Sequence, residues 1–261
     1  MKTVLSLSLL VVLLGCTRPS SHSGADTVRV LTYNIHHANP PSKPEIIDLE
    51  AIARVIKSDQ PDVVMIQEVD VRTRRSGQVD EAEKLAQLTG LQAYFVKAID
   101  HDGGDYGVAL LSKYPLRNQR RYPLPLDPQK PGEPRVLGMA ELKLPSGRSI
   151  TVACTHLDAQ RGPASRILQA KEIARILKAV PMPIILAGDL NDTPESETLR
   201  ILNQSLQSTC QNCAPTIPVE NPRKTIDFIL TSGPWKVTEH RVIQETYASD
   251  HLPVRATLSL P

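Results

Sequence analysis

Four short apolar runs of this chain end on a side chain that carries an amide, a carboxylate or an imidazole, and this pattern constrains the fold more than any other feature. The runs are rich in aliphatic and β-branched residues, which is typical of buried strands. They span residues 28–33, 63–67, 149–155 and 184–188, and the side chains that follow them are Asn34, Glu68, His156 and Asp189. Asp250 and His251 precede a last apolar run near the C-terminus. We expect the fold to bring these side chains together.

The remaining segments predict a mixture of helices and strands. Apolar residues recur at helical spacing in segments predicted to be helices, at 46–56, 81–88, 163–177 and 196–202. Between residues 91 and 144 short apolar runs are separated by turns with Pro and Gly, which favours antiparallel strands. The other predicted strands are 93–96, 107–112, 136–142, 225–230, 235–243 and 253–258. One α/β domain over residues 27–261 is the most economical interpretation.

The composition argues against binding that is driven by charge or by base stacking. The formal net charge of the 261 residues is only +2, so no large field is available to attract a polyanion. Aromatic residues make up 3% of the chain, which is few for a platform that stacks single-stranded bases. Nucleic acid therefore stays a possible substrate but is not promoted by composition.

The N-terminus predicts export. Lys2 is followed by an apolar run at 4–14 that is too short to span a membrane, which is typical of a secretory signal. The run ends on Leu-Leu-Gly-Cys at 13–16, which resembles a bacterial lipoprotein cleavage box and predicts lipidation of Cys16; the alternative is an ordinary signal peptide. Residues 17–26 are small and polar and predict a flexible tether. We expect residues 1–16 to be a signal peptide and the mature protein to be a membrane-anchored lipoprotein on the periplasmic or cell-surface side.

The other three cysteines have simpler interpretations. Cys154 lies inside an apolar run and is predicted to be buried in the core. Cys210 and Cys213 form a C-x-x-C in a polar loop, for which a local disulfide is favoured in an oxidising compartment. A redox motif would need a following helix and a metal site would need two more ligands nearby, and neither is evident.

The polar strand ends suggest a hydrolase that uses a metal ion. Carboxylates and amides suit a hard divalent cation, above all Mg²⁺, with Mn²⁺ possible. Such a cation beside imidazoles can activate water and neutralise charge on a phosphoryl oxygen. The chain has neither a G-x-x-x-x-G-K-[ST] loop for a nucleoside triphosphate nor a G-x-S-x-G for acyl transfer. Hydrolysis by activated water is therefore favoured over a covalent serine mechanism.

Six short motifs occur in an order that resembles the endonuclease/exonuclease/phosphatase superfamily, the group that includes deoxyribonuclease I. The resemblance covers about residues 28–260, and its motifs are Thr32-Tyr33-Asn34-Ile35, Ile66-Gln67-Glu68-Val69, Thr155-His156-Leu157-Asp158, Gly188-Asp189-Leu190-Asn191, Ile226-Asp227-Phe228-Ile229 and Ser249-Asp250-His251. It implies an α/β fold in the form of a four-layer sandwich, with two mainly antiparallel β-sheets face to face and helices on the outer faces.

The resemblance also implies metal ligands and substrate contacts. By this resemblance, Glu68 has the position of the principal metal ligand, with Asn34 beside it. Asp250 has the position of a further metal-binding or orienting carboxylate. Arg135 and Arg161 are further candidates for contacts to the substrate phosphate.

The catalytic roles follow from the same resemblance. By this resemblance, Asp189 has the position of the group that orients or deprotonates the attacking water, and Asn191 has the position of a residue that contacts the phosphate. His251 is similar to a phosphate-binding or proton-handling imidazole, with Asp227 hydrogen-bonded behind it. His156 is similar to a second imidazole that stabilises charge on the phosphate or the leaving oxygen.

Several charged or titratable residues stay without an assigned role. His36 occupies a position where some relatives carry an acidic metal neighbour, whereas His37, His101 and His240 have no supporting context. The basic loop 72–77 is compatible both with a solvated turn and with anion steering at the mouth of the site.

The sequence thus predicts an exported, Mg²⁺-dependent phosphoesterase that hydrolyses a phosphodiester or a phosphomonoester. A nucleic acid, a phospholipid head group and a sugar phosphate are all open as substrates, because fold does not determine substrate. The expected partners are this substrate and, through the lipid anchor, the membrane; no obligate protein partner is evident. The alternative is a non-catalytic binding lipoprotein that keeps the fold.

Overall fold

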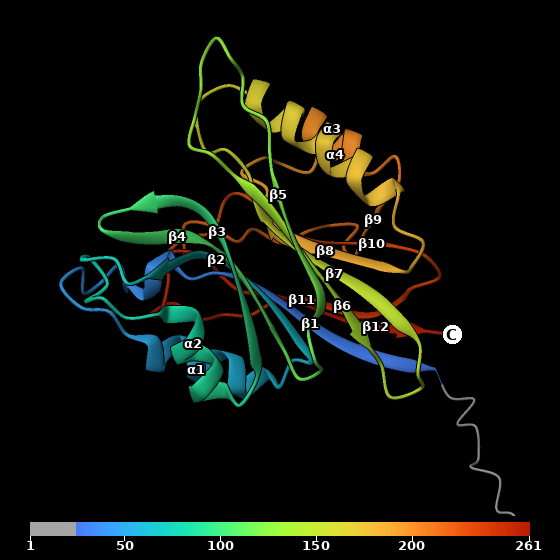
Figure 1. Ribbon diagram of the computed structural model, residues 1–261, viewed down its shortest axis with the longest axis horizontal. Coiled ribbons are helices and arrows are strands. Elements are labelled where there is room, and N and C mark those ends of the chain that lie inside the picture. The colour runs from blue at the N-terminus through green and yellow to red at the C-terminus, as the bar shows by residue number, and fades with distance from the viewer. Residues whose placement is uncertain (1–24) are drawn as a thin grey trace, which may run out of the picture.

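Two six-stranded β-sheets form the centre of the protein in the computed structural model, which describes residues 25–261 (Figure 1). The first sheet has the strand order β11-β12-β1-β2-β4-β3, and the second has the order β5-β6-β7-β8-β10-β9. The strands of the first sheet are β1 (Asp26–Asn34), β2 (Val63–Val71), β3 (Gln92–His101), β4 (Gly104–Ser112), β11 (Lys236–Val242) and β12 (Val254–Leu260). Those of the second are β5 (Arg117–Pro123), β6 (Val136–Lys143), β7 (Ser149–His156), β8 (Ile184–Asp189), β9 (Gln207–Ser208) and β10 (Asp227–Ser232).

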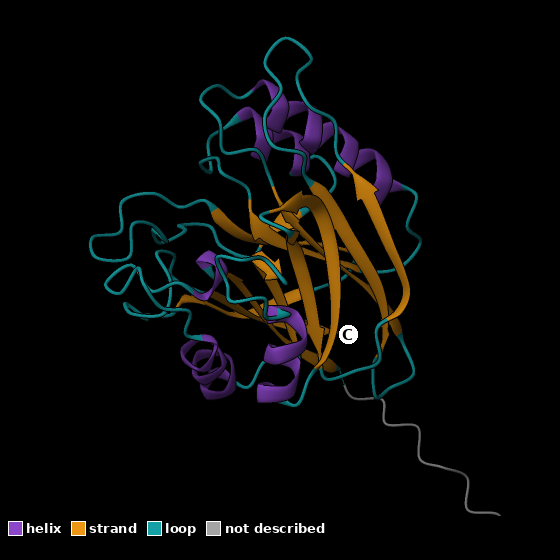
Figure 2. Cartoon of the chain, turned by 60° about the vertical axis from the view of Figure 1, so that its left-hand side comes forward, coloured by secondary structure: helices purple, strands orange, loops and turns teal. Residues whose placement is uncertain are grey.

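Each sheet contains one parallel pair of strands, β1 with β2 and β7 with β8, and its other neighbours are antiparallel. Helices cover the outer faces, as Figures 1 and 2 show. Helices α1 (Leu49–Asp59) and α2 (Glu81–Thr89) lie on the first sheet, and α3 (Ala164–Lys178) and α4 (Glu197–Leu202) lie on the second. The predicted four-layer sandwich of mainly antiparallel sheets is therefore confirmed.

The central strands are apolar on both faces because each face packs against a layer. In β1, Val28 and Val30 belong to the core between the two sheets, whereas Leu31 and Tyr33 face the core beneath α1 and α2. Side chains of a strand alternate between its faces, so a strand buried on both sides reads as a continuous apolar run. This explains why β1, β2 and β8 could be predicted as strands from the sequence.

Helix α1 begins three residues later than the helical spacing predicts. Asp48 caps the helix, because its side chain accepts a hydrogen bond from the backbone N–H of Ala51 at 2.8 Å. Ile46 lies outside the helix, and its carbonyl oxygen accepts a hydrogen bond from the Asn39 side chain at 2.6 Å. The helix ends at Asp59, and the next residue, Gln60, adopts a left-handed conformation.

Strands β5 and β9 were not predicted. The first of them is exposed along nearly its whole length and carries Arg117, Arg120 and Arg121, so it has no apolar pattern to find. Charged side chains on an edge strand oppose pairing with another chain. Strand β9 has only two residues. At the N-terminus, Asp26, the last residue of the predicted tether, is already part of β1.

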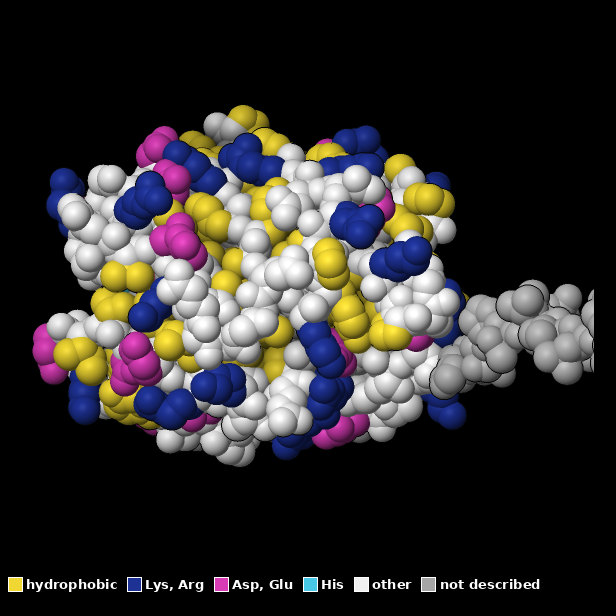
Figure 3. All heavy atoms as spheres, turned by 60° about the horizontal axis from the view of Figure 1, so that its bottom comes forward, with side chains coloured by type: hydrophobic (Ala, Val, Ile, Leu, Met, Phe, Trp, Pro, Cys, Tyr) yellow, Lys and Arg dark blue, Asp and Glu magenta, His cyan; other side chains and the backbone are white. Residues whose placement is uncertain are grey.

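The cysteines have the predicted states. Cys154 is free and buried, and Cys210 and Cys213 form a disulfide. The predicted signal peptide, the lipidation site Cys16 and the tether to residue 24 lie outside the described residues. Within residues 25–261, none of the helices combines the length and the apolar character needed to cross a membrane. Positive and negative side chains are interspersed on the face shown in Figure 3, consistent with the small net charge.

Candidate active site

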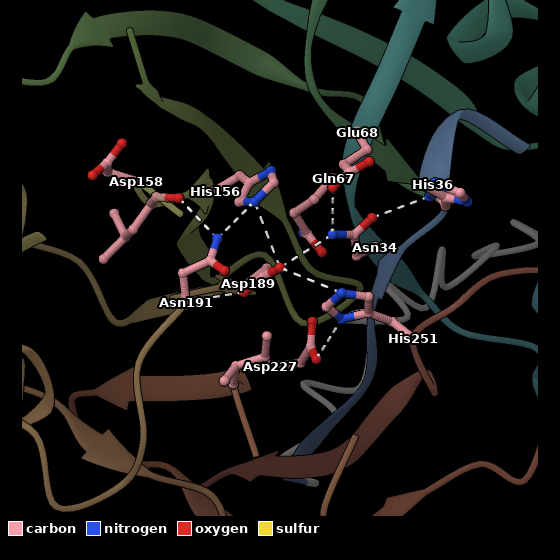
Figure 4. A network of polar contacts seen from close by, with 12 residues as sticks. Asn34, His36, Gln67, Glu68, His156, Asp158, Asp189, Asn191, Asp227 and His251 are labelled. Carbon is pink, nitrogen blue, oxygen red and sulfur yellow. Dashed lines mark hydrogen bonds and ion pairs between the residues drawn. The ribbon is translucent and has the colours of Figure 1, made fainter. Parts of the chain in front are cut away.

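Strand register brings three predicted residues side by side in the second sheet. His156 at the end of β7 pairs with Asp189 at the end of β8, and Asp189 pairs with Asp227 at the start of β10. All three side chains are buried. Since paired residues of adjacent strands project from the same face, the three side chains gather at one edge of this sheet. Figure 4 shows Asp189 at the centre of the resulting polar network.

The first sheet contributes two more residues to the same edge. Asn34 ends β1, and its Nδ2 donates to Asp189 Oδ2 and to Glu68 Oε1, both at 3.1 Å. Glu68 lies in β2 at an irregularity in the pairing with β4 and has a φ of 57°. This bulge turns the Glu68 side chain away from the regular alternation of the strand. The site is therefore assembled across both sheets, with Asn34 as the bridge.

His251 enters the site from the loop before β12 and is held by Asp227. Its Nδ1 lies 2.9 Å from Asp227 Oδ2, and its Nε2 lies 3.7 Å from Asp189 Oδ2. Thr216 Oγ1 donates to the same Asp227 oxygen at 2.6 Å. Ser249 Oγ fixes the loop by donating to the carbonyl oxygen of Asn34 at 2.7 Å. Asp227 thus stands behind the imidazole, as the resemblance implies.

The surroundings of His251 and Asp189 change the pKa of both groups. Burial lowers the pKa of His251, but the charge and hydrogen bond of Asp227 outweigh it and raise that pKa to about 10. Burial, followed by the charge of Asp227, raises the pKa of Asp189 to about 7, against the opposing effect of His251. At neutral pH His251 is therefore a cation, while Asp189 can gain or lose a proton.

His156 has the opposite charge state. Its Nδ1 lies 3.1 Å from Nη1 of Arg135, and its Nε2 lies 2.9 Å from Nδ2 of Asn191 and 3.5 Å from Asp189 Oδ2. A guanidinium and an amide nitrogen can only donate, so the ring meets a donor at each nitrogen, which favours its neutral form. Burial, followed by the charge of Arg135, lowers the pKa of His156 well below its usual value. His156 is therefore a neutral imidazole at neutral pH.

Asn191 and Glu68 are held at the rim of this network. The backbone N–H of Asn191 donates to Asp189 Oδ1 at 2.8 Å, and its side chain donates to the carbonyl oxygen of Leu157 at 3.0 Å. Burial raises the pKa of Glu68, but the neighbouring His37 imidazole, the hydrogen bond from Asn34 and the positive charge of His251 outweigh it. The net effect is a pKa well below the usual value, so Glu68 is a carboxylate at neutral pH.

In the part of the chain that the structure describes, two groups of side chains have the spacing needed to hold a metal ion, with ligand atoms within 4.8 Å of one another: His36 with His37 and Glu68, and Asp189 with Asp227 and His251. In the second group, protonated His251 has no free lone pair, and its Nδ1 is bonded to Asp227. In the first group, Nδ1 of His37 is buried without a hydrogen-bond partner, and Glu68 is an anion. The group around Glu68 therefore fits a divalent cation better.

Three predicted features lie apart from this network. Asp250 is half-buried, belongs to neither of the two groups, and accepts a 3.4 Å hydrogen bond from Ser249. Arg161 is exposed, and its carbonyl oxygen accepts a hydrogen bond from Lys130. In the loop 72–77, the side chains of Arg74 and Arg75 are ion-paired with Asp102 and Asp70 respectively, which favours a structural turn over anion steering.

Sequence reasoning did not select several residues that build the site. His37 was without context because only the fold brings it 3.9 Å from Glu68. Buried Gln67 hydrogen-bonds Thr32 and contacts Cys154, which links the two sheets beneath the site. Gln67 lies within one of the six motifs, and its position next to Glu68 in an apolar run is the one signal in the sequence for its role.

This chain has two packed β-sheets with carboxylates, amides and imidazoles at one edge, which is the arrangement of phosphoesterases with an α/β-sandwich fold. The family model for the endonuclease/exonuclease/phosphatase family matches residues 31–251, and the chain therefore belongs to this family. This is a family of phosphoesterases, and the polar network is built mainly from residues of the six sequence motifs that resemble it.

Individual relatives add detail. The chain is 28% identical over 188 residues to an inositol phosphosphingolipids phospholipase C from Schizosaccharomyces pombe, in a match that covers 66% of this chain and 43% of that protein. A solved structure of an endonuclease/exonuclease/phosphatase from Beutenbergia cavernae has a TM-score of 0.75 at 24% identity, covering 90% of this chain and 72% of that one. A mannosyl-6-phosphatase from Bacteroides thetaiotaomicron has a TM-score of 0.70 at 18% identity, covering 88% and 99%. Both solved structures are similar to this chain in fold.

Proposed function

We propose that this chain is a divalent-metal-dependent phosphoesterase in which water activated at Asp189 attacks the phosphorus of a phosphodiester or phosphomonoester. One observation carries the proposal: the Asp189 carboxylate lies within 3.7 Å of both imidazoles and 3.1 Å from Asn34, next to Glu68. A carboxylate with a pKa of about 7 is suited to accept a proton from water at neutral pH.

The two imidazoles have separate tasks around the phosphoryl group. His251 directs Nε2–H of a cationic ring towards Asp189, because its Nδ1–H is held by Asp227. It would bind a non-bridging phosphoryl oxygen by charge and hydrogen bond. His156 presents Nε2 of a neutral ring to the same space, 3.5 Å from Asp189 Oδ2. A neutral imidazole adds no positive charge beside Asp189 and so does not lower the pKa of the base.

Glu68 would hold the metal ion at the side of the first sheet, and Asn34 orients this carboxylate by a hydrogen bond. The ion would supply positive charge against the phosphoryl and leaving oxygens. Asn34 positions this ligand relative to the base, since one amide group donates to both Glu68 and Asp189. The catalytic base and the metal-binding carboxylate are thereby kept in fixed register across the two sheets.

We further propose that the enzyme acts outside the cytoplasm on a membrane surface. The basic Lys2, the apolar run at 4–14 and the Leu-Leu-Gly-Cys box at 13–16 support lipidation at Cys16. The related phospholipase C and the structurally similar mannosyl-6-phosphatase support phospholipid head groups and sugar phosphates as substrate classes beside nucleic acid.

The test is turnover by the full chain, purified in detergent with Mg²⁺ or Mn²⁺, on supercoiled plasmid, on vesicles that contain an inositol phosphosphingolipid, and on mannose 6-phosphate. We expect release of product from at least one of these and a loss of at least about 10²-fold in kcat for Asp189→Asn. Asp100→Asn is the matched control, because it makes the same change on a carboxylate that is 92% exposed. A chain that binds such a substrate without turnover identifies the non-catalytic binding lipoprotein instead, whereas an active parent with a fully active Asp189→Asn variant refutes the role of Asp189 as the base.

A further inference from the structure

Two histidines that follow Asn34 lie against Glu68. Each of His36, His37 and Glu68 offers one ligand atom, and the three atoms lie within 4.8 Å of one another. All three residues are half-buried, so they can be reached from solvent and are partly shielded from it. The short 3₁₀ helix η1 (His36–Ala38) supplies both imidazoles.

The tautomer of His36 is fixed in the form that can bind a metal ion. Its Nδ1 lies 2.9 Å from the carbonyl oxygen of Asn39, which can only accept, so Nδ1 carries the proton. Nε2 is then left with a free lone pair. A hydrogen bond from one ring nitrogen to a backbone carbonyl is the usual way in which proteins orient a metal-binding imidazole.

His37 has a ring nitrogen that needs a partner. Its Nδ1 is buried, finds no hydrogen-bond partner among residues 25–261, and lies 3.9 Å from Glu68 Oε2. Buried polar atoms are nearly always paired, and an exception calls for an explanation. A cation that contacts both this nitrogen and the Glu68 carboxylate provides one.

The backbone around this cluster is held in an unfavourable conformation. His36, His37 and Ala38 have φ values of 47°, 42° and 52°, and Glu68 has a φ of 57°. Residues with a Cβ rarely adopt this left-handed region, and such strain is concentrated at functional sites. The turn is closed by hydrogen bonds from Ala38 N–H to the Ile35 oxygen and from Asn39 N–H to the His36 oxygen, which keep both imidazoles on Glu68.

We propose that His36, His37 and Glu68 form a mixed imidazole–carboxylate centre that binds a first-row transition metal ion, such as Mn²⁺ or Zn²⁺, in preference to Mg²⁺. Imidazole nitrogens favour transition metals, whereas Mg²⁺ prefers an all-oxygen set. This inference deepens the proposed function, on which its catalytic meaning rests. It replaces the expectation of a predominantly Mg²⁺-dependent site.

The experiment measures metal binding without substrate. Mn²⁺ is titrated into the full chain in detergent, with electron paramagnetic resonance to count free Mn²⁺ and electron spin-echo modulation to detect ¹⁴N bonded to the bound ion. We expect ¹⁴N modulation in the parent chain, and displacement of Mn²⁺ only by an excess of Mg²⁺ on the order of 100-fold. A His36→Asn, His37→Asn double variant loses the modulation, whereas His101→Asn, a histidine outside the cluster, keeps it.

A further set of variants separates this site from its neighbours. His251→Gln keeps the ¹⁴N modulation, because His251 belongs to the other group around Asp189. His36→Asp, which restores a carboxylate, shifts the preference towards Mg²⁺, and this variant serves if the double variant does not fold. Bound Mn²⁺ without ¹⁴N modulation, modulation that persists in the double variant or vanishes in His251→Gln, or displacement by equimolar Mg²⁺ overturns the proposal.

Failure of the proposed function gives a different result. If the chain shows ¹⁴N-coupled Mn²⁺ but turns over none of the substrates, the imidazole–carboxylate metal centre is supported and the catalytic proposal is refuted. If the chain turns over a substrate but binds Mn²⁺ only through oxygen, the catalytic proposal is supported and the imidazole centre is refuted.

Discussion

Replacing Asp227 by Asn tests how the site keeps His251 protonated. The rise in the pKa of His251 from 6.5 to about 10 corresponds to about 5 kcal/mol in favour of the imidazolium. Burial opposes this rise, and Asp227 is the largest cause in its favour, ahead of Asp189 and Asp250. Asn can still accept the hydrogen bonds from His251 and from Thr216, so the geometry at 2.9 and 2.6 Å can be kept while the charge is lost.

We expect the midpoint of the His251 titration to fall by about 2 pH units or more in Asp227→Asn. The assay is ¹⁵N nuclear magnetic resonance of the histidine rings against pH in metal-free buffer, with His251→Gln to assign the signal. Thr216→Val is the control, because it removes a neutral donor to Asp227 and leaves the carboxylate in place. A midpoint in Asp227→Asn within about half a pH unit of the parent value would refute the reasoning.

The same change has a consequence for stability, with a definite sign. A histidine whose pKa is raised on folding stabilises the protein fully below its unfolded value, and this contribution is lost as the pH rises through the folded value. For His251 that window runs from pH 6.5 to about 10. The difference in free energy of unfolding between the parent and Asp227→Asn should therefore be largest below pH 6.5 and shrink as the pH approaches 10, as urea titrations can measure.

Three further changes probe packing, covalent structure and the second imidazole. Gly138→Ala places a Cβ 2.5 Å from a methyl group of the facing strand β3, so urea unfolding should show a loss of about 1–3 kcal/mol; an unchanged midpoint contradicts the tight packing. Replacing Cys210 and Cys213 by Ser should cost only about 2 kcal/mol by calorimetry, because the disulfide closes a short loop of sequence separation 3; full unfolding at 37 °C contradicts this estimate. Arg135→Lys should lower kcat about tenfold or more, since the lysine side chain is one bond shorter and does not reach the position of Nη1, which contacts both His156 at 3.1 Å and the neighbouring glutamate; unchanged kcat with folded protein contradicts this role.

Much of the fold follows from local sequence, because most central strands pack on both faces and so are continuous apolar runs. The strand ends at Asn34, His156 and Asp189 were placed for this reason, whereas the predicted end at Glu68 was wrong, because β2 continues through a bulge to Val71. Strand β5 was missed because its exposed arginines carry no apolar pattern. Local spacing also cannot show where a helix is capped, so the hydrogen bond to the Asp48 side chain, not the apolar periodicity, sets the start of α1.

The site was only partly predictable, since its assembly depends on long-range geometry. The pairing of Asp227 with His251 was expected from the resemblance, and the structure places the two 2.9 Å apart. Of the two arginine candidates, Arg135 contacts His156, whereas Arg161 is exposed in a loop; composition alone could not separate them. His37 acquires a context only through the left-handed turn that directs it to Glu68, and no local pattern encodes that conformation.

The two imidazoles beside Asp189 differ because their second ring nitrogens meet opposite charges. Nδ1 of His251 faces the carboxylate of Asp227 at 2.9 Å, and Nδ1 of His156 faces the guanidinium of Arg135 at 3.1 Å. The first contact holds a proton on its ring and the second removes one, although both rings are buried. The site thus presents one cation and one neutral imidazole to the same carboxylate. Two cations would bind the Asp189 charge more strongly and lower its pKa, which would weaken it as a base, whereas two neutral rings would leave a bound phosphate without compensation.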